Sequence, residues 1–111
     1  MTVANLHATS FPADERLADA ELLRAAVFAD GFARPEEPCV LAGDFNVRAE
    51  RSWTLAELRG RGWGFTAGGP GIDHALVRGV PAGPVVRLPD DRRRVAGRLL
   101  SDHAPVEVRV G

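Results

Sequence analysis

The sequence predicts a mixed α/β (α+β) fold, in which one mixed sheet carries helices on one face. One observation is the order of the predicted elements: a strand, a helix, a strand and a short helix come first, and three strands follow. A second is the composition, because 45% hydrophobic and 26% charged residues are typical of a globular protein. The length of 111 residues favours a single domain over residues 1–111.

The first two predicted elements are an apolar strand and an amphipathic helix. Val3–Ala8 is short and apolar and is followed by a polar step, which indicates a strand. Asp14–Asp30 has apolar residues at spacings of three and four, so we expect a helix that begins near Asp14 and stops at Gly31. The predicted buried face of this helix consists of Leu17, Ala20, Leu23, Val27 and Phe28.

The rest of the chain is predicted to form a short helix and four more strands. Cys39–Ala42 is fully apolar, as is typical of a buried strand. Thr54–Arg59 is predicted to be a short helix, because Thr54 and Glu57 have the spacing of a capping box. Three further runs have strand character, and the last alternates between apolar and polar residues: Ile72–Val77, Val85–Leu88 and Ala104–Val110.

The charge and the cysteine content exclude several broad classes of protein. A net charge of -1 and a pI near 6.3 argue against a surface wholly dedicated to nucleic acid or anionic membrane. Cys39 is the one cysteine, so an internal disulfide is excluded, and the three scattered histidines lack zinc-ligand spacing. We find no signal peptide and no transmembrane segment, so a cytoplasmic location is the default expectation.

Two polar clusters lie at the ends of the first two predicted strands. Asn5 and His7 lie on one face of a strand by alternation, although two ordinary polar residues would give the same pattern. Gly43 permits a sharp turn after the buried strand, so that Asp44 and Asn46 point the same way. A carboxylate beside an amide suits a metal-bound phosphate and its attacking water, although a common Asx turn would also use this pair.

Two further clusters lie on later strands. Asp73 is a charge within an apolar strand, and it should have a partner because burying a lone carboxylate is costly. His74 points to the opposite face, and we interpret it as structural. Asp102 and His103 place an acidic ligand and a titratable imidazole at the start of the last strand. A turn at the strand entry with Asp102 as a solvated cap would give the same pattern. These two neighbours line one site only where the chain is irregular, because neighbours in a strand face opposite ways.

A charged segment, Pro89–Gly97, is predicted to be a loop. Its arginines, Arg92, Arg93 and Arg94, would suit phosphate contacts, but we favour a solvated loop because that is the commoner role of a charge run. The four polar clusters together would supply three carboxylates, two imidazoles and an amide. A carboxylate that orients a histidine makes the imidazole an effective acid or base, so we expect Asp73 beside His103.

In this order, at strand ends, the four clusters resemble the endonuclease/exonuclease/phosphatase superfamily, which includes pancreatic-type deoxyribonuclease, abasic-site endonuclease, sphingomyelinase and inositol phosphatase. The resemblance implies a divalent-metal-dependent nuclease or phosphatase with Mg²⁺ or Mn²⁺ as its cofactor and a phosphate ester as its substrate. The substrate class stays open among DNA, RNA, a lipid head group and a phosphomonoester. The matching segments are Asn5–His7, Leu41–Asn46, Gly71–His74 and Ser101–Val106.

The resemblance also implies roles for single residues. His103 would act on the attacking water or on a phosphoryl oxygen, and Asp73 would orient it. Asp102 would be a metal ligand. The remaining residues would act on the water and the substrate: Asp44 and Asn46 would bind water and phosphate, His7 would be a second catalytic histidine, and Asn5 would support it as a substrate-binding residue.

The superfamily's fold is a two-sheet sandwich flanked by helices, and this chain resembles only the later half of it. The family's principal metal ligand, a glutamate, comes from an earlier segment, and we find no counterpart among the glutamates that follow His7. The alternative to an active phosphoesterase is therefore an incomplete half-domain, which acts with a partner or as a structural fragment. We expect weak magnesium binding and slow turnover, and either self-association or a missing N-terminal half. The face expected to be exposed consists of Val3, Cys39–Ala42, Val106, Val108 and Val110.

Overall fold

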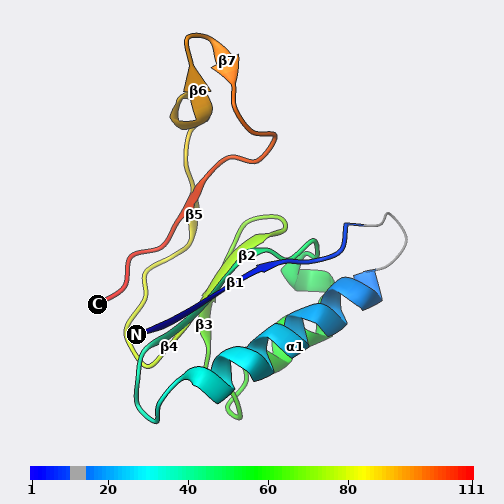
Figure 1. The fold of residues 1–111 in the computed structure, drawn as a ribbon, viewed down its shortest axis with the longest axis vertical. Helices are drawn as coiled ribbons and strands as arrows, with labels where there is room; N and C mark the ends of the chain where they lie inside the picture. Colours follow the sequence, from blue (N-terminus) through cyan, green and yellow to red (C-terminus); the bar gives the residue numbers. More distant parts are fainter. Residues whose placement is uncertain (11–14) are drawn as a thin grey trace.

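The centre of the protein is a four-stranded mixed sheet. A computed structural model describes residues 1–10 and 15–111, with the strand order β1-β2-β4-β3 (Figure 1). β1 and β2 run parallel, whereas β4 is antiparallel to both of its neighbours, β2 and β3. The predicted mixed α/β fold is therefore confirmed. The bounds of these strands are β1 (Thr2–His7), β2 (Cys39–Asp44), β3 (Thr66–Gly68) and β4 (Asp73–Arg78).

Helix α1 (Glu15–Phe32) connects β1 to β2 and packs against the sheet (Figure 1). Its predicted start at Asp14 lies outside the described residues, and it continues through Gly31 instead of stopping there. The predicted buried face was wrong, because Val27 and Phe28 are 56% and 64% exposed. Three alanines and one leucine are buried on this helix instead. The buried positions are Ala18, Leu22, Ala26 and Ala29.

Helix α2 (Trp53–Leu58) follows the short 3-10 helix η1 (Ala49–Arg51). The predicted cap at Thr54 was wrong: the Ser52 hydroxyl accepts the capping hydrogen bond from the Leu55 N–H at 2.9 Å. Asp19 of α1 explains the difference, because its carboxylate accepts hydrogen bonds from the Ser52 hydroxyl and from the Thr54 hydroxyl and N–H. α2 is thereby fastened to α1. No helix in residues 1–10 and 15–111 is long and apolar enough to cross a membrane.

The two faces of the main sheet have different surroundings. Both helices cover one face, and the core lies between them and the sheet. The alternate residues of β1, β2 and β4 point to the opposite side, which we call the open face. Its members are Val3, Asn5, His7, Val40, Ala42, Asp44, Asp73, Ala75 and Val77.

The expected exposed apolar surface is only partly present. Val3 and Val110 are 67% and 39% exposed, as expected. Cys39 and Leu41 are instead fully buried, because strand alternation places them on the side that the helices cover. Val106 and Val108 are half-buried.

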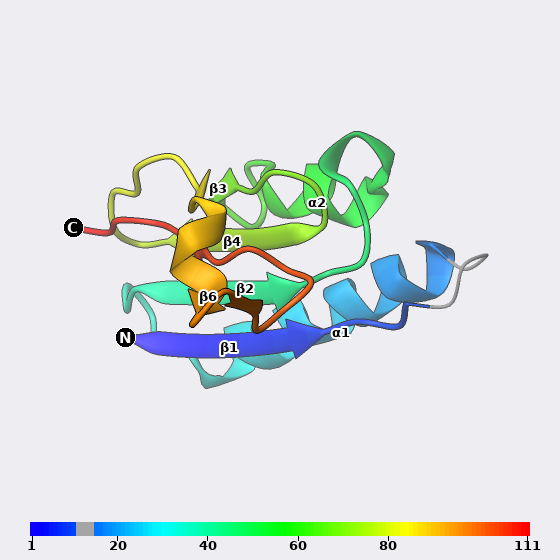
Figure 2. The same ribbon diagram turned by 90° about the horizontal axis from the view of Figure 1, so that it is seen from above.

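After β4 the chain forms an arm that rises from the open face, on the side of the sheet away from α1 (Figures 1 and 2). β5 pairs with β8, and β6 pairs with β7 at the tip of the arm. The predicted strand Ala104–Val110 is regular only at Val106–Glu107, and the predicted loop Pro89–Gly97 contains a 3-10 helix and a short strand. The elements of the arm are β5 (Val86–Arg87), η2 (Asp90–Arg93), β6 (Arg94–Val95), β7 (Arg98–Leu99) and β8 (Val106–Glu107).

Candidate active site

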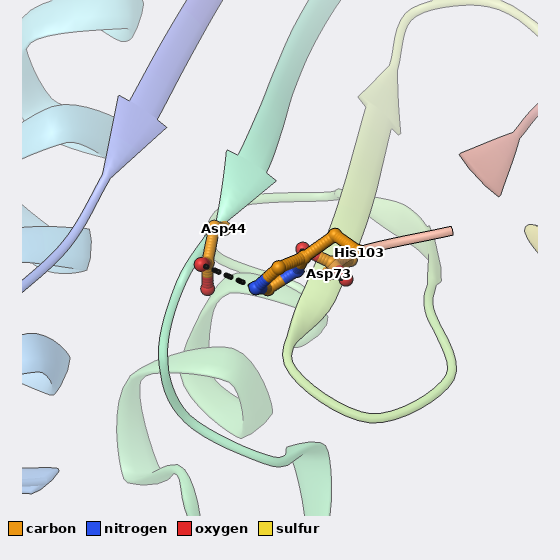
Figure 3. Close-up of side chains that lie close together, drawn as sticks. All are labelled: Asp44, Asp73 and His103. Carbon is orange, nitrogen blue, oxygen red and sulfur yellow. Dashed lines mark hydrogen bonds and ion pairs between the residues drawn. The ribbon is translucent and has the colours of Figure 1, made fainter. Parts of the chain in front are cut away.

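Sheet register brings three of the predicted residues to one end of the open face. His7 ends β1 and pairs with Asp44 at the end of β2, and Asp44 pairs in turn with Asp73 at the start of β4. Since β4 runs antiparallel to β2, its beginning lies beside the end of β2. The side chains of Asp44 and Asp73 therefore lie close together, and His103 reaches them from the arm (Figure 3).

Gly43 permits the close approach of β1 and β2 at this end of the sheet. Its φ of 141° is rarely adopted by residues with a side chain. A Cβ atom at this position would lie 2.0 Å from the carbonyl oxygen of Leu6. The predicted sharp turn after the buried strand is thus also a close backbone contact, which fixes His7 next to Asp44.

The predicted hydrogen bond between Asp73 and His103 is present. The Nδ1–H of His103 lies 2.8 Å from Asp73 Oδ2 and 3.0 Å from Asp73 Oδ1. The chain is irregular at this point, as the prediction required, because the His103 N–H donates to the Ser101 hydroxyl at 3.1 Å in a bend. The other ring nitrogen, Nε2, lies 3.6 Å from Asp44 Oδ2. The imidazole therefore lies between two carboxylates, as Figure 3 shows.

These carboxylates change the acidity of the His103 imidazole. The hydrogen bond from His103 to Asp73 is the largest cause, and together with the charges of Asp73, Asp44 and Asp102 it raises the pKa of His103 above its ordinary value. Partial burial acts in the opposite direction and is outweighed. With Nδ1–H committed to Asp73, Nε2 is the ring atom that is free to gain or lose a proton.

Asn46 supports Asp44 through the backbone. Its N–H donates to Asp44 Oδ1 at 3.0 Å, and its side-chain amide donates to the carbonyl of Ala8 at 2.7 Å. The left-handed conformation of Asn46, with a φ of 50°, is one that asparagine adopts more readily than most residues. The Asn46 amide therefore ties the loop after β2 to the segment after β1 and holds the Asp44 carboxylate in place.

The other predicted residues lie at the rim. His7 Nε2 is 3.8 Å from Asp44 Oδ2, and the His7 side chain is 77% exposed. Asn5 lies on the same face of β1, but in the described part of the chain it has no hydrogen bond to the cluster. The Asp102 side chain is 95% exposed, with Oδ1 4.0 Å from His103 Nε2.

His74 faces away from this site, as predicted. It is fully buried under the helices, where its Nε2–H donates to the Val47 carbonyl at 2.8 Å and its ring stacks on Phe45. Burial lowers the pKa of His74, which favours the neutral form of the ring. We therefore retain the structural interpretation.

A divalent cation is compatible with the donor atoms at this site. Asp44, Asp73 and His103 each offer one ligand atom, and these atoms lie within 4.8 Å of one another. Asp102, the predicted metal ligand, is not one of these three residues, and its exposed carboxylate lies 4.0 Å from His103 Nε2. Mg²⁺ is commonly held by one or two carboxylates and retains several waters, so the donor set fits Mg²⁺ or Mn²⁺.

Sequence reasoning missed two arginines beside the site. A cavity of about 410 Å³ has Arg48 and Arg87 in its lining, together with Asp73, Asp102 and His103. The position of Arg48, two residues after Asn46, was its only signal in the sequence. Arg87 had no signal in the sequence, because only the pairing of β5 with β8 brings it near His103.

Comparisons with known proteins identify a family and a similar fold. The model of the endonuclease/exonuclease/phosphatase family matches residues 5–103. A crystal structure titled as a functionally unknown conserved protein from Enterococcus faecalis V583 has a similar fold, with a TM-score of 0.70 and 20% sequence identity. The match covers 98% of this chain and 49% of that one, so the chain spans about half the length of that protein. No curated protein matches the sequence.

Proposed function

The chain belongs to the endonuclease/exonuclease/phosphatase family, whose members are generally hydrolytic phosphoesterases, and from this premise we propose that it hydrolyses phosphate esters with a divalent metal ion. The observation that carries the proposal is the pairing of Asp73 with His103 Nδ1, which leaves Nε2 facing Asp44 at 3.6 Å. A half-buried carboxylate, an oriented imidazole and a second carboxylate form a constellation suited to proton transfer at a phosphate.

Each side chain has a proposed task in this reaction. Asp73 holds the ring of His103 and stabilises its protonated form. His103 Nε2 moves the proton of the attacking water or donates to a phosphoryl oxygen. Asp44 accepts a hydrogen bond from the water, and the Asn46 N–H keeps its carboxylate in position. His7, on the other side of Asp44, offers a second hydrogen bond to the phosphate.

The proposed cation is Mg²⁺ or Mn²⁺, with Asp44 and Asp102 as its ligands. When bound, such a cation would neutralise negative charge on the phosphate oxygens. Asp44 Oδ2 and Asp102 Oδ1 lie 3.6 and 4.0 Å from His103 Nε2, whereas both oxygens of Asp73 are hydrogen bonded to the imidazole.

We expect the chain to hydrolyse bis-p-nitrophenyl phosphate in Mg²⁺ or Mn²⁺, and to lose this activity in EDTA. His103→Ala should lose it in either metal, because the imidazole supplies the proton transfer. Release of p-nitrophenolate measures the rate, and Arg98→Ala is a control far along the arm. Turnover that persists in EDTA, or in His103→Ala, would show that another site carries the activity.

A second candidate is a catalytically incomplete half-domain that acts with a partner. The exposed valine at the start of β1 favours it, because Val3 is 67% exposed on the open face and the chain spans half of the protein it matches. We then expect a mass above 11.9 kDa by light scattering, and no turnover by the isolated chain. Val3→Asp should return the mass to that of a monomer, whereas the same change at Val95 of β6, which is 61% exposed, should not. A monomeric, active chain would eliminate this candidate.

A further inference from the structure

The cavity beside His103 is large enough for part of an organic substrate. Its volume is about 410 Å³, which lies within the range of small-molecule sites. One part of its lining is apolar and comes from Pro70, Ile72, Ala104 and Val106. His103 and Asp73 also line it, so its contents would lie next to the proposed reaction centre.

Two arginines in this lining form no ion pair with a carboxylate in residues 1–10 and 15–111. Arg48 comes from the loop after Asn46 and Arg87 from β5, and neither side chain forms a salt bridge or hydrogen bond with a described residue. Four arginines elsewhere form ion pairs with a described carboxylate, namely Arg51, Arg78, Arg93 and Arg109, so the position of Arg48 and Arg87 in the cavity lining, and not the lack of an ion pair alone, distinguishes these two. Unpaired guanidinium groups from two segments of the chain are suited to an anion that has several oxygens.

The acidic residues in the lining leave these arginines available. Asp73 is hydrogen bonded to His103, and the side chain of Asp102 is 95% exposed to solvent. The net charge of -1 provides no general attraction for a long polyanion. The combination of a cavity of limited volume, a partly apolar lining and two unpaired guanidinium groups favours a small ligand over a polynucleotide.

We propose that Arg48 and Arg87 bind a second phosphate group, so that the substrate is a small organic phosphate ester with two phosphates. This assignment rests on the proposed phosphoesterase function: one phosphate lies at His103 and the other at the two arginines, which line the same cavity, with the organic part between the two phosphates. The arginines then determine specificity, and they take no part in proton transfer.

Binding without turnover tests this proposal. The probes are adenosine 3′,5′-bisphosphate and adenosine 5′-monophosphate, which differ by one phosphate, titrated by calorimetry in EDTA. We expect the bisphosphate to bind roughly 10- to 100-fold more tightly, as is typical of charge-assisted hydrogen bonds. Arg48→Ala and Arg87→Ala should each reduce that preference, whereas Arg92→Ala, an exposed arginine outside the cavity lining, should not.

The outcomes separate this proposal from the proposed function. Equal affinity for the two probes, or a preference that survives in both cavity variants, overturns the second-phosphate site even where the chain hydrolyses diesters. A preference that the two variants abolish supports the site even where the isolated chain has no turnover. Tighter binding of a ten-nucleotide single strand, lost in Arg48→Ala, would overturn the assignment to a small ligand. Circular dichroism of each variant checks that it is folded.

Discussion

Asp73→Asn is expected to lower the rate of phosphodiester hydrolysis roughly 10²- to 10⁴-fold, the usual contribution of an acid–base group. Asn has nearly the same shape as Asp, but it has no charge to stabilise a protonated imidazole. It also has one acceptor oxygen for Nδ1–H, where Asp73 offers two at 2.8 and 3.0 Å. The ring would lose both its orientation and its favoured tautomer. Initial rates against pH, in the form of the protein that shows turnover, measure the effect.

A titration of His103 by NMR distinguishes this role from a loss of folding. Since Asp73 raises the pKa of His103, Asp73→Asn should lower that pKa, and the imidazole should deprotonate at a lower pH than in the unchanged protein. Asp91→Asn is the matched control, because Asp91 is an exposed carboxylate of η2 outside the site. A rate loss below tenfold, or an unchanged His103 pKa, would contradict the orienting role.

Local physical rules predicted that Asp73 has a partner, and the general pairing of a carboxylate with an acid–base histidine pointed to His103, 30 residues away. Strand alternation placed Asp73 and His74 on opposite faces, and the cost of burying a carboxylate required a partner for Asp73. The sequence also showed that Asp102 and His103 cannot both line a site in a regular strand. It did not show what bends the chain there, because the Ser101 hydroxyl that accepts from the His103 N–H has many possible partners in a sequence.

Contacts distant in sequence account for the errors. Apolar residues of α1 occur at three- and four-residue spacings on two faces, and only the packed sheet selects Ala18, Leu22 and Ala26 over Val27 and Phe28. The bond from the Asn46 amide to the Ala8 carbonyl joins residues 38 apart, and the Thr54–Asp19 bonds join residues 35 apart. Local pattern cannot select such partners, and this is why Asn46 was assigned to the water and the phosphate and Thr54 to a cap.

The position of Asp44 depends on a backbone contact that one methyl group would disrupt, and Gly43→Ala is therefore expected to reduce the free energy of unfolding by roughly 2–6 kcal/mol. The new Cβ atom would lie 2.0 Å from the Leu6 carbonyl oxygen, and a φ of 141° is strained for alanine. The parallel strands β1 and β2 would have to separate at the end that places His7 beside Asp44. Urea denaturation, followed by circular dichroism, measures the loss.

Gly31→Ala is the control for this change. Gly31 lies in α1, and a Cβ atom added there would meet nothing within 4 Å, so alanine should stabilise the protein by roughly 0.5–1 kcal/mol. If Gly43→Ala lowers the free energy of unfolding and Gly31→Ala raises it, the effect at Gly43 is due to the β1–β2 contact. In Gly43→Ala we also expect the hydrolysis rate to fall while the hydrogen bond between Asp73 and His103 persists, because that pair comes from β4 and the arm. A Gly43→Ala protein as stable as the unchanged chain would show that β1 and β2 can separate freely, and that His7 is not fixed beside Asp44 by their packing.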